Sequence, residues 1–174
     1  PAISDACHDT ARRAMTLMRE AGRSISFDPN LRPTLWSSPE RMRQAINDLA
    51  AQADWVLPGL EEGLFLTGQS TPQGVARFYL DRGAKLVVVK LGPEGAYFEG
   101  DAGSGFVPGF LVVRVVDTVG AGDGFAVGVI SALLAGCTPE QAAYRGAWIG
   151  ARAVQVLGDT EGLPTKAQLQ EAGL

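Results

Sequence analysis

Apolar runs and amphipathic segments alternate along most of this chain. Residues 85–90 are predicted to form a strand buried on both faces, because residues 86–89 are a continuous apolar run. Residues 9–21 instead place their apolar side chains at helical spacing. The same patterns predict further strands over 24–27, 54–57, 96–98 and 111–116, further helices over 39–52, 59–68, 71–83, 122–135 and 139–157, and a loop over 101–109.

This alternating order predicts an α/β fold, with a mostly parallel sheet sandwiched by helices. We expect residues 1–174 to form a single domain, because the length suits one hydrophobic core and no linker interrupts the pattern. In such folds ligands bind outside the carboxyl ends of the strands. The candidate motifs all follow predicted strands, so we expect them to form one site.

Composition narrows the functional classes. The chain has 46% hydrophobic and 20% charged residues, and a net charge of −4. This acidic balance argues against nucleic acid or an anionic membrane as a partner. No apolar run approaches the roughly 20 residues that span a bilayer. Cys7 and Cys137 lie far apart without metal-site spacing, so we expect free thiols and a cytoplasmic protein.

Asp117-Thr-Val-Gly-Ala-Gly-Asp-Gly-Phe125 is the most informative stretch, because it joins a predicted strand to a predicted helix. Gly120 and Gly122 allow a tight bend that brings bare N–H groups close to a ligand. The first amides of a helix lack partners, and the helix dipole adds positive potential there. Such a turn suits a phosphate. Asp123 within it is placed to accept a proton from an attacking hydroxyl.

A second string, Asp28-Pro-Asn-Leu-Arg-Pro33 followed by Leu35-Trp36, comes after the strand predicted at 24–27. The two prolines stiffen the loop, so Arg32 presents its planar donors from a defined position, suited to a carboxylate or phosphate. The alternative is an ordinary turn held by the Asp28 and Asn30 side chains.

Together the two strings resemble the ribokinase-like (PfkB) carbohydrate kinases. Residues 117–125 look like the C-terminal signature of that family, and the form of residues 28–36 is most similar to 2-keto-3-deoxygluconate kinases, with bacterial fructokinases next. The resemblance implies a ribokinase-like fold and transfer of the γ-phosphoryl group of ATP to a sugar hydroxyl. It also implies Mg²⁺ as a cofactor, with K⁺ as a further cation in several relatives.

The resemblance assigns catalytic roles to residues of both strings. Asp123 would be the general base, and the amides of Gly120, Ala121 and Gly122 would form the anion hole. Arg32 would meet the acidic end of the sugar or the transferring phosphate.

The resemblance extends to a metal-linked position. Glu62 matches the family glutamate that organises Mg²⁺ and its waters, although Gly59 stands where the family usually has asparagine. The alternative is that Glu61 and Glu62 only decorate the first turn of a helix, where the dipole favours acid.

Three further positions follow from the same resemblance. Lys90, Gly92 and Gly95 resemble the loop on the nucleotide side, although a Gly-Pro turn between two strands would look alike. Asp159 matches a substrate-contacting aspartate of some ketodeoxygluconate kinases, and its alternative is an exposed loop acid. Asp117 would serve a monovalent cation, or only hold the turn.

The resemblance covers only the C-terminal portion of the family pattern. Members begin with a further strand–helix region that carries a Gly-Gly sugar motif, and they have a small β-sheet as a lid, neither of which is recognisable in residues 1–22. We therefore expect the C-terminal part of a longer kinase, inactive by itself if the lid is needed. An exposed sheet edge would then pair with the missing N-terminal half or with a second copy.

Two other classes of function stay open at this stage. One is a non-catalytic nucleotide-binding module. The other is a Rossmann oxidoreductase, prompted by Gly120-x-Gly122-x-Gly124. That fingerprint normally follows the first strand of its domain and has a second strand after its helix. Here it comes late and two predicted helices follow it, which disfavours the oxidoreductase.

Overall fold

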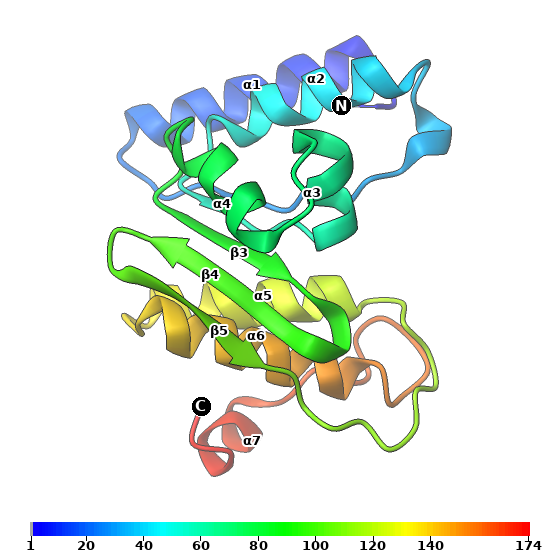
Figure 1. The fold of residues 1–174 in the computed structure, drawn as a ribbon, viewed down its shortest axis with the longest axis vertical. Coiled ribbons are helices and arrows are strands. Elements are labelled where there is room, and N and C mark those ends of the chain that lie inside the picture. The colour runs from blue at the N-terminus through cyan, green and yellow to red at the C-terminus, as the bar shows by residue number, and fades with distance from the viewer. Residues whose placement is uncertain (1) are drawn as a thin grey trace. The chain divides into compact units, whose positions relative to one another are not determined.

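The computed structural model describes residues 2–174 (Figure 1). Internal contacts divide the chain into two compact units, residues 1–89 and 90–174, which we call the first and the second unit. Each is described by itself, and the organisation as a single domain stays a prediction. Among the described residues, no helix is both long and apolar enough to cross a membrane.

The strands of the first unit are parallel, as predicted. β1 (Ser26–Phe27) pairs with β2 (Trp55–Val56), and β2 pairs with β3 (Leu86–Lys90). The β3 side chains from Leu86 to Val89 are all buried, in agreement with the continuous apolar run. β1 and β2 are shorter than the predicted strands, because each keeps only two residues in the ladder.

Four helices belong to the first unit: α1 (Asp5–Glu20), α2 (Pro39–Ala50), α3 (Leu60–Thr67) and α4 (Pro72–Leu80). Hydroxyl groups cap two of these helices: the Ser38 hydroxyl accepts from the Arg41 amide, and the Thr71 hydroxyl accepts from the Gly74 amide. Gly68 ends α3 in the left-handed conformation, with φ of 75°.

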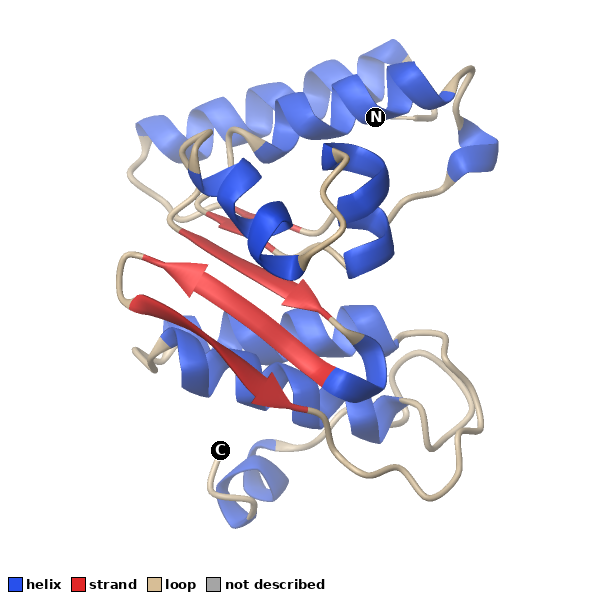
Figure 2. Ribbon diagram, viewed as in Figure 1, coloured by secondary structure: helices blue, strands red, loops and turns tan. Residues whose placement is uncertain are grey.

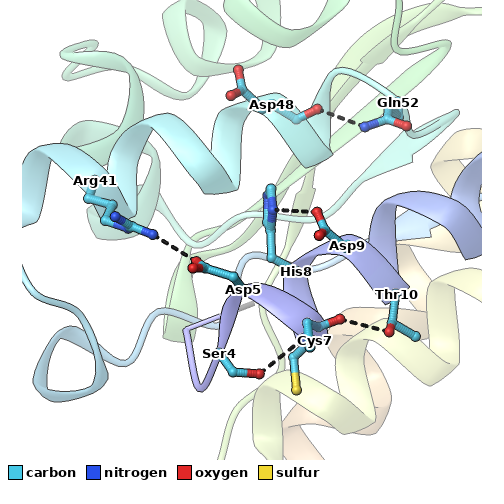
Figure 3. A network of polar contacts seen from close by, with 10 residues as sticks. Ser4, Asp5, Cys7, His8, Asp9, Thr10, Arg41, Asp48 and Gln52 are labelled. Atoms are coloured by element: carbon cyan, nitrogen blue, oxygen red, sulfur yellow. Dashed lines mark hydrogen bonds and ion pairs between the residues drawn. The ribbon is translucent and has the colours of Figure 1, made fainter.

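α1 is held against α2 by polar contacts (Figure 3). An Arg41 Nη2 donates to Asp5 Oδ1 at 2.9 Å, and Arg19 donates to the Gln52 carbonyl near the other end of α1. None of the α1 residues is buried. This helix therefore contributes little apolar burial to the first unit.

The second unit begins with a β-hairpin, β4 (Gly95–Gly100) and β5 (Gly103–Pro108), entered through a short 3₁₀ turn at Gly92–Glu94 (Figure 2). The prediction of a loop over 101–109 is wrong for 103–108. Glycine and proline there disfavour a strand locally, but pairing along all of β4 outweighs this preference. Gly105 also leaves room for the Phe98 ring opposite, since a Cβ there would lie 3.2 Å from it.

Helices α5 (Ala121–Leu134) and α6 (Pro139–Ala153) lie side by side, and α6 also packs on the hairpin (Figure 1). Gly128 and Gly146 permit the close approach of the two helices, because a Cβ on Gly128 would lie 2.7 Å from the Gly146 Cα. A short third helix, α7 (Lys166–Glu171), was not predicted from the sequence.

The strand predicted at 111–116, before the glycine-rich signature, is wrong. The segment forms no strand, and Leu111 and Val113 are 93% and 92% exposed. Its β-branched residues favour a strand, but its backbone finds another partner. The amides of Val116 and Asp117 both donate to the Val154 carbonyl, at the end of α6. The signature is therefore reached from an irregular loop.

Candidate functional site

A cavity of about 840 Å³ in the second unit opens beside the first turn of α5. Lys90, Gly92 and Gly95, which the sequence assigns to the nucleotide side, all line it. Ala121 and Gly122 of the signature line it as well. The structure thus brings five predicted site residues from two distant motifs to one cavity of a size ordinary for a small-molecule site.

Gly120 shapes the turn that leads into α5. Its φ of 76° is left-handed, and a Cβ there would lie 2.7 Å from the Asp159 carbonyl oxygen. No larger residue fits without moving the backbone. The same contact places the backbone of Asp159 against the signature, while the Asp159 side chain is exposed.

The start of α5 suits an anion. No side chain caps its first turn, so the amides there keep their positive potential. Lys90 adds a positive charge at the same place, since a Cβ added to Gly122 would lie 3.8 Å from Lys90 Nζ. Like charges brought this close favour an anion bound to both.

Asp123 is the third residue of α5 and its side chain is exposed. It makes no hydrogen bond or ion pair with any residue that the structure describes. Asp123 is not among the residues that line the cavity, although the neighbouring Gly122 is. Both carboxylate oxygens of Asp123 are available at a helix start that suits an anion. Asp123 can therefore accept a proton from a hydroxyl group.

Asp117 uses its side chain to hold the turn: Oδ1 accepts a hydrogen bond from the Val119 amide at 3.0 Å. This is a turn closed by an aspartate side chain. The alternative role weighed from the sequence, holding the turn, is therefore observed, and a role in binding a monovalent cation stays a prediction.

Glu62, in the first unit, joins two segments. Its Oε2 accepts from the Gly59 amide at 2.8 Å, and its Oε1 accepts from the Leu31 amide at 2.9 Å. The carboxylate thereby ties the start of α3 to the loop after β1. Each oxygen retains a second lone pair that could accept from a metal-bound water.

Arg32 lies in that same loop and is exposed, with Nη1 donating only to the Leu31 carbonyl at 2.9 Å. The preceding Asn30 has a φ of 42°, the only left-handed residue other than glycine among those described. The loop therefore bends sharply before Arg32 and leaves most of the guanidinium donors unused.

Gly95 and Gly109 have a structural role beside the cavity. A Cβ on Gly95 would lie 2.1 Å from the Val107 carbonyl oxygen, and one on Gly109 would lie 1.9 Å from the Pro93 carbonyl oxygen. Both glycines let the 3₁₀ turn pack on the end of β5. The cavity wall at this point is thus bare backbone.

Sequence reasoning missed much of the cavity lining. The 111–116 run was assigned to a strand, yet Leu111, Val112 and Val115 line the cavity. The sequence feature that could have indicated this lining was the series of small residues along α6. Its cavity-facing members are Ala147, Gly150 and Ala151, joined by Val154, Phe110, Thr118 and Phe125 from the surrounding segments.

No cluster of three or more His, Cys, Asp or Glu side chains that could hold a metal occurs among residues 2–174.

Comparison with known proteins bears on the resemblance. The chain is 54% identical to 2-dehydro-3-deoxygluconokinase of Bacillus subtilis (strain 168) over 97% of its own length and 52% of that protein. A PfkB protein from Polaromonas sp. JS666 superposes with a TM-score of 0.88 at 68% identity, covering 98% of this chain and 53% of that one.

A fructokinase from Vibrio cholerae O395, a double mutant with fructose, ADP and potassium ion bound, superposes equally well. Its TM-score is 0.88 at 32% identity, covering 97% of this chain and 56% of that one. This chain thus spans about half the length of the relatives it matches. The likeness confirms the predicted ribokinase-like α/β fold.

The model of the pfkB family carbohydrate kinases matches residues 2–166, which is nearly the whole of this chain. This match agrees with the two strings that suggested the family and with the glycine-rich turn at the cavity. The chain therefore belongs to the pfkB family of carbohydrate kinases.

Proposed function

We propose that this chain is the nucleotide-binding and catalytic half of an ATP-dependent sugar kinase whose acceptor is 2-keto-3-deoxygluconate. The observation that carries the proposal is the 840 Å³ cavity, because Lys90 and the uncapped start of α5 meet there. The choice of acceptor is supported by the 54% identity to a kinase named for that sugar acid.

In this proposal the second unit holds ATP and carries out the transfer. The base and ribose occupy the apolar part of the cavity, and the phosphates extend towards Lys90 and the amides of Gly120, Ala121 and Gly122. These donors stabilise the charge that develops on the transferred phosphoryl group. Asp123 accepts the proton of the sugar hydroxyl as its oxygen attacks phosphorus.

The first unit supplies the arginine that recognises the acceptor and the glutamate associated with Mg²⁺. Arg32, whose donors are largely unused, pairs with the carboxylate of the sugar acid or with the transferring phosphate. Glu62 accepts hydrogen bonds from waters of Mg²⁺ while keeping its two amide partners. Mg²⁺, when bound, would supply positive charge that offsets the charge of the phosphates.

Asp159 and Asp117 have supporting roles in the proposal. The backbone of Asp159 lies against Gly120 of the signature, and the Asp159 side chain contacts the acceptor sugar. Asp117 binds a monovalent cation such as K⁺, in addition to holding its turn.

Sugar-stimulated release of ADP tests the proposed acceptor. With ATP and Mg²⁺, the complete protein should release ADP at a high rate with 2-keto-3-deoxygluconate and much more slowly with fructose and ribose. A clear preference for fructose would replace the proposed acceptor with fructose, the second candidate, which the fructose-bound relative supports.

A non-catalytic nucleotide-binding module is the remaining alternative. It predicts that ADP binds but that no sugar stimulates ADP release, even in the complete protein. The identity to proteins named as sugar kinases disfavours it.

A further inference from the structure

A second cavity lies in the second unit, towards the start of α6 and away from the signature. It measures about 450 Å³ and is enclosed by β5, the segment 137–145 and the last residues after α7. None of its lining residues has a role in the proposed phosphoryl transfer. The volume suits a small organic molecule.

Arg145 gives this cavity a positive charge and forms no ion pair with any residue that the structure describes. Among these residues it makes one hydrogen bond, a weak one from Nη2 to Cys137 Sγ at 3.8 Å, and its buried Nε has no partner. Sulfur is a poor acceptor, and a buried charged donor without a partner is costly. A carboxylate would accept two parallel hydrogen bonds from the N–H groups along one edge of the guanidinium.

The rest of the lining restricts the kind of anion. Phe106, Pro108 and Tyr144 supply apolar and aromatic surface, which favours a ligand with a hydrophobic body. Glu140 also lines the cavity, so a ligand with several negative charges would be repelled. The chemistry thus selects a small organic molecule with a single carboxylate.

An aromatic contact joins a residue that lines this cavity to a residue that lines the 840 Å³ cavity. The Phe110 and Tyr144 rings lie 4.9 Å apart, edge to face. Phe110 lines the larger cavity and Tyr144 lines the smaller one. A ligand that shifts Tyr144 therefore also shifts a wall of the larger cavity.

We propose that the 450 Å³ cavity binds a small organic monocarboxylate through Arg145, and that the Phe110–Tyr144 pair couples this ligand to the nucleotide cavity. The proposed binding rests on the cavity and on Arg145, and it is independent of the proposed function. The coupling rests on the proposed nucleotide function.

Benzoate serves as the probe for binding, followed by amide shifts in NMR spectra of the full chain. Saturable shifts are expected at residues of β5 and of 137–145, with no saturation by the neutral benzamide. Arg145→Met should weaken benzoate binding by at least about tenfold. Arg152→Met is the matched control, because Arg152 lies on the same helix, stacks over Trp148 and is outside the cavity lining.

Arg145→Lys is a second test of the site that remains usable if Arg145→Met fails to fold. It keeps the charge but loses the planar fork, so an intermediate affinity is expected. Equal binding of benzoate and benzamide to the unmodified chain, or no saturation by benzoate up to about 10 mM, would overturn the site.

The coupling is measured as the Kd of a non-hydrolysable ATP analogue with Mg²⁺, in the absence and presence of saturating benzoate. A change of at least about fivefold is expected, and Tyr144→Leu should abolish it. An unchanged Kd with benzoate bound would overturn the coupling. Complete absence of nucleotide binding would overturn the proposed function and the coupling with it, while the benzoate titration would still decide the site itself.

Discussion

Helices α3 and α5, one in each unit, begin alike but differ in how they use the acid at their third position. Each has glycine at the N-cap and an acid at the third position: Gly59 with Glu62, and Gly120 with Asp123. Glu62 accepts two backbone hydrogen bonds and closes its own helix start. Asp123 accepts none from the described residues and is exposed.

Two physical differences separate the pair. Glutamate has one more methylene, so its carboxylate reaches back to the N-cap amide, as in a capping box. The N-cap glycines also differ, with φ of −74° at Gly59 and 76° at Gly120, so the chain enters the two helices from different directions. The result is a structural acid in α3 and an available acid in α5.

The largest effect on stability is expected at the α5 start, from Gly120→Ala. The left-handed φ and the Asp159 backbone both oppose a Cβ there, so unfolding should become easier by about 3 kcal/mol. Gly136→Ala is the control: its φ is 81° but no atom lies within 4 Å, so only about 1 kcal/mol is expected. Equal losses in chemical denaturation would contradict the contact with Asp159.

A smaller loss, about 2 kcal/mol, is expected from Glu62→Gln, because an amide NH₂ would face a backbone N–H that loses its acceptor. Glu61→Gln, at the exposed neighbour, and Asp123→Asn should each stay within about 0.5 kcal/mol of the unchanged chain in the same denaturation experiment. A similar loss of stability in Asp123→Asn would contradict the difference assigned to the acids of the two helices.

The smallest loss, about 1 kcal/mol, is expected from Asp54→Asn in the first unit. Burial opposes ionisation of Asp54, but hydrogen bonds from Lys85 at 2.8 Å and from the Ile25 amide at 2.9 Å outweigh it and lower its pKa below 3.8. A lowered pKa stabilises the fold above pH 3.8 and loses that contribution as the pH falls through the folded value.

The difference in unfolding free energy between Asp54→Asn and the unchanged chain should therefore shrink below pH 3.8. Denaturation curves recorded from pH 7 down to about pH 3 measure it. A difference that grows with acid would contradict the assigned interactions of Asp54.

The sequence predicted most of what local chemistry decides. The structure contains the helices expected over 39–52 and 59–68 and the buried strand expected over 85–90. Family resemblance likewise predicted that Lys90 and Gly122 belong to one site, and both residues line the same cavity.

Two wrong predictions of secondary structure show where local sequence patterns do not determine the fold. Residues 103–108 form a strand because β4 pairs with them, despite their glycines and proline. Residues 111–116 form none, despite their β-branched side chains, and the amide of their last residue, Val116, donates instead to the Val154 carbonyl. In both segments the partner lies outside the segment itself, and a pattern along the chain cannot reveal it.

The turnover of Asp123→Asn tests the central claim most directly. In the complete protein with ATP, Mg²⁺ and 2-keto-3-deoxygluconate, we expect kcat to fall about 10²–10⁴-fold while the Kd for ATP stays within about threefold. Glu94→Gln, an acid of the 3₁₀ turn outside the cavity lining, should leave kcat unchanged. A kcat for Asp123→Asn close to that of the unchanged protein would contradict the assignment of Asp123 as the general base.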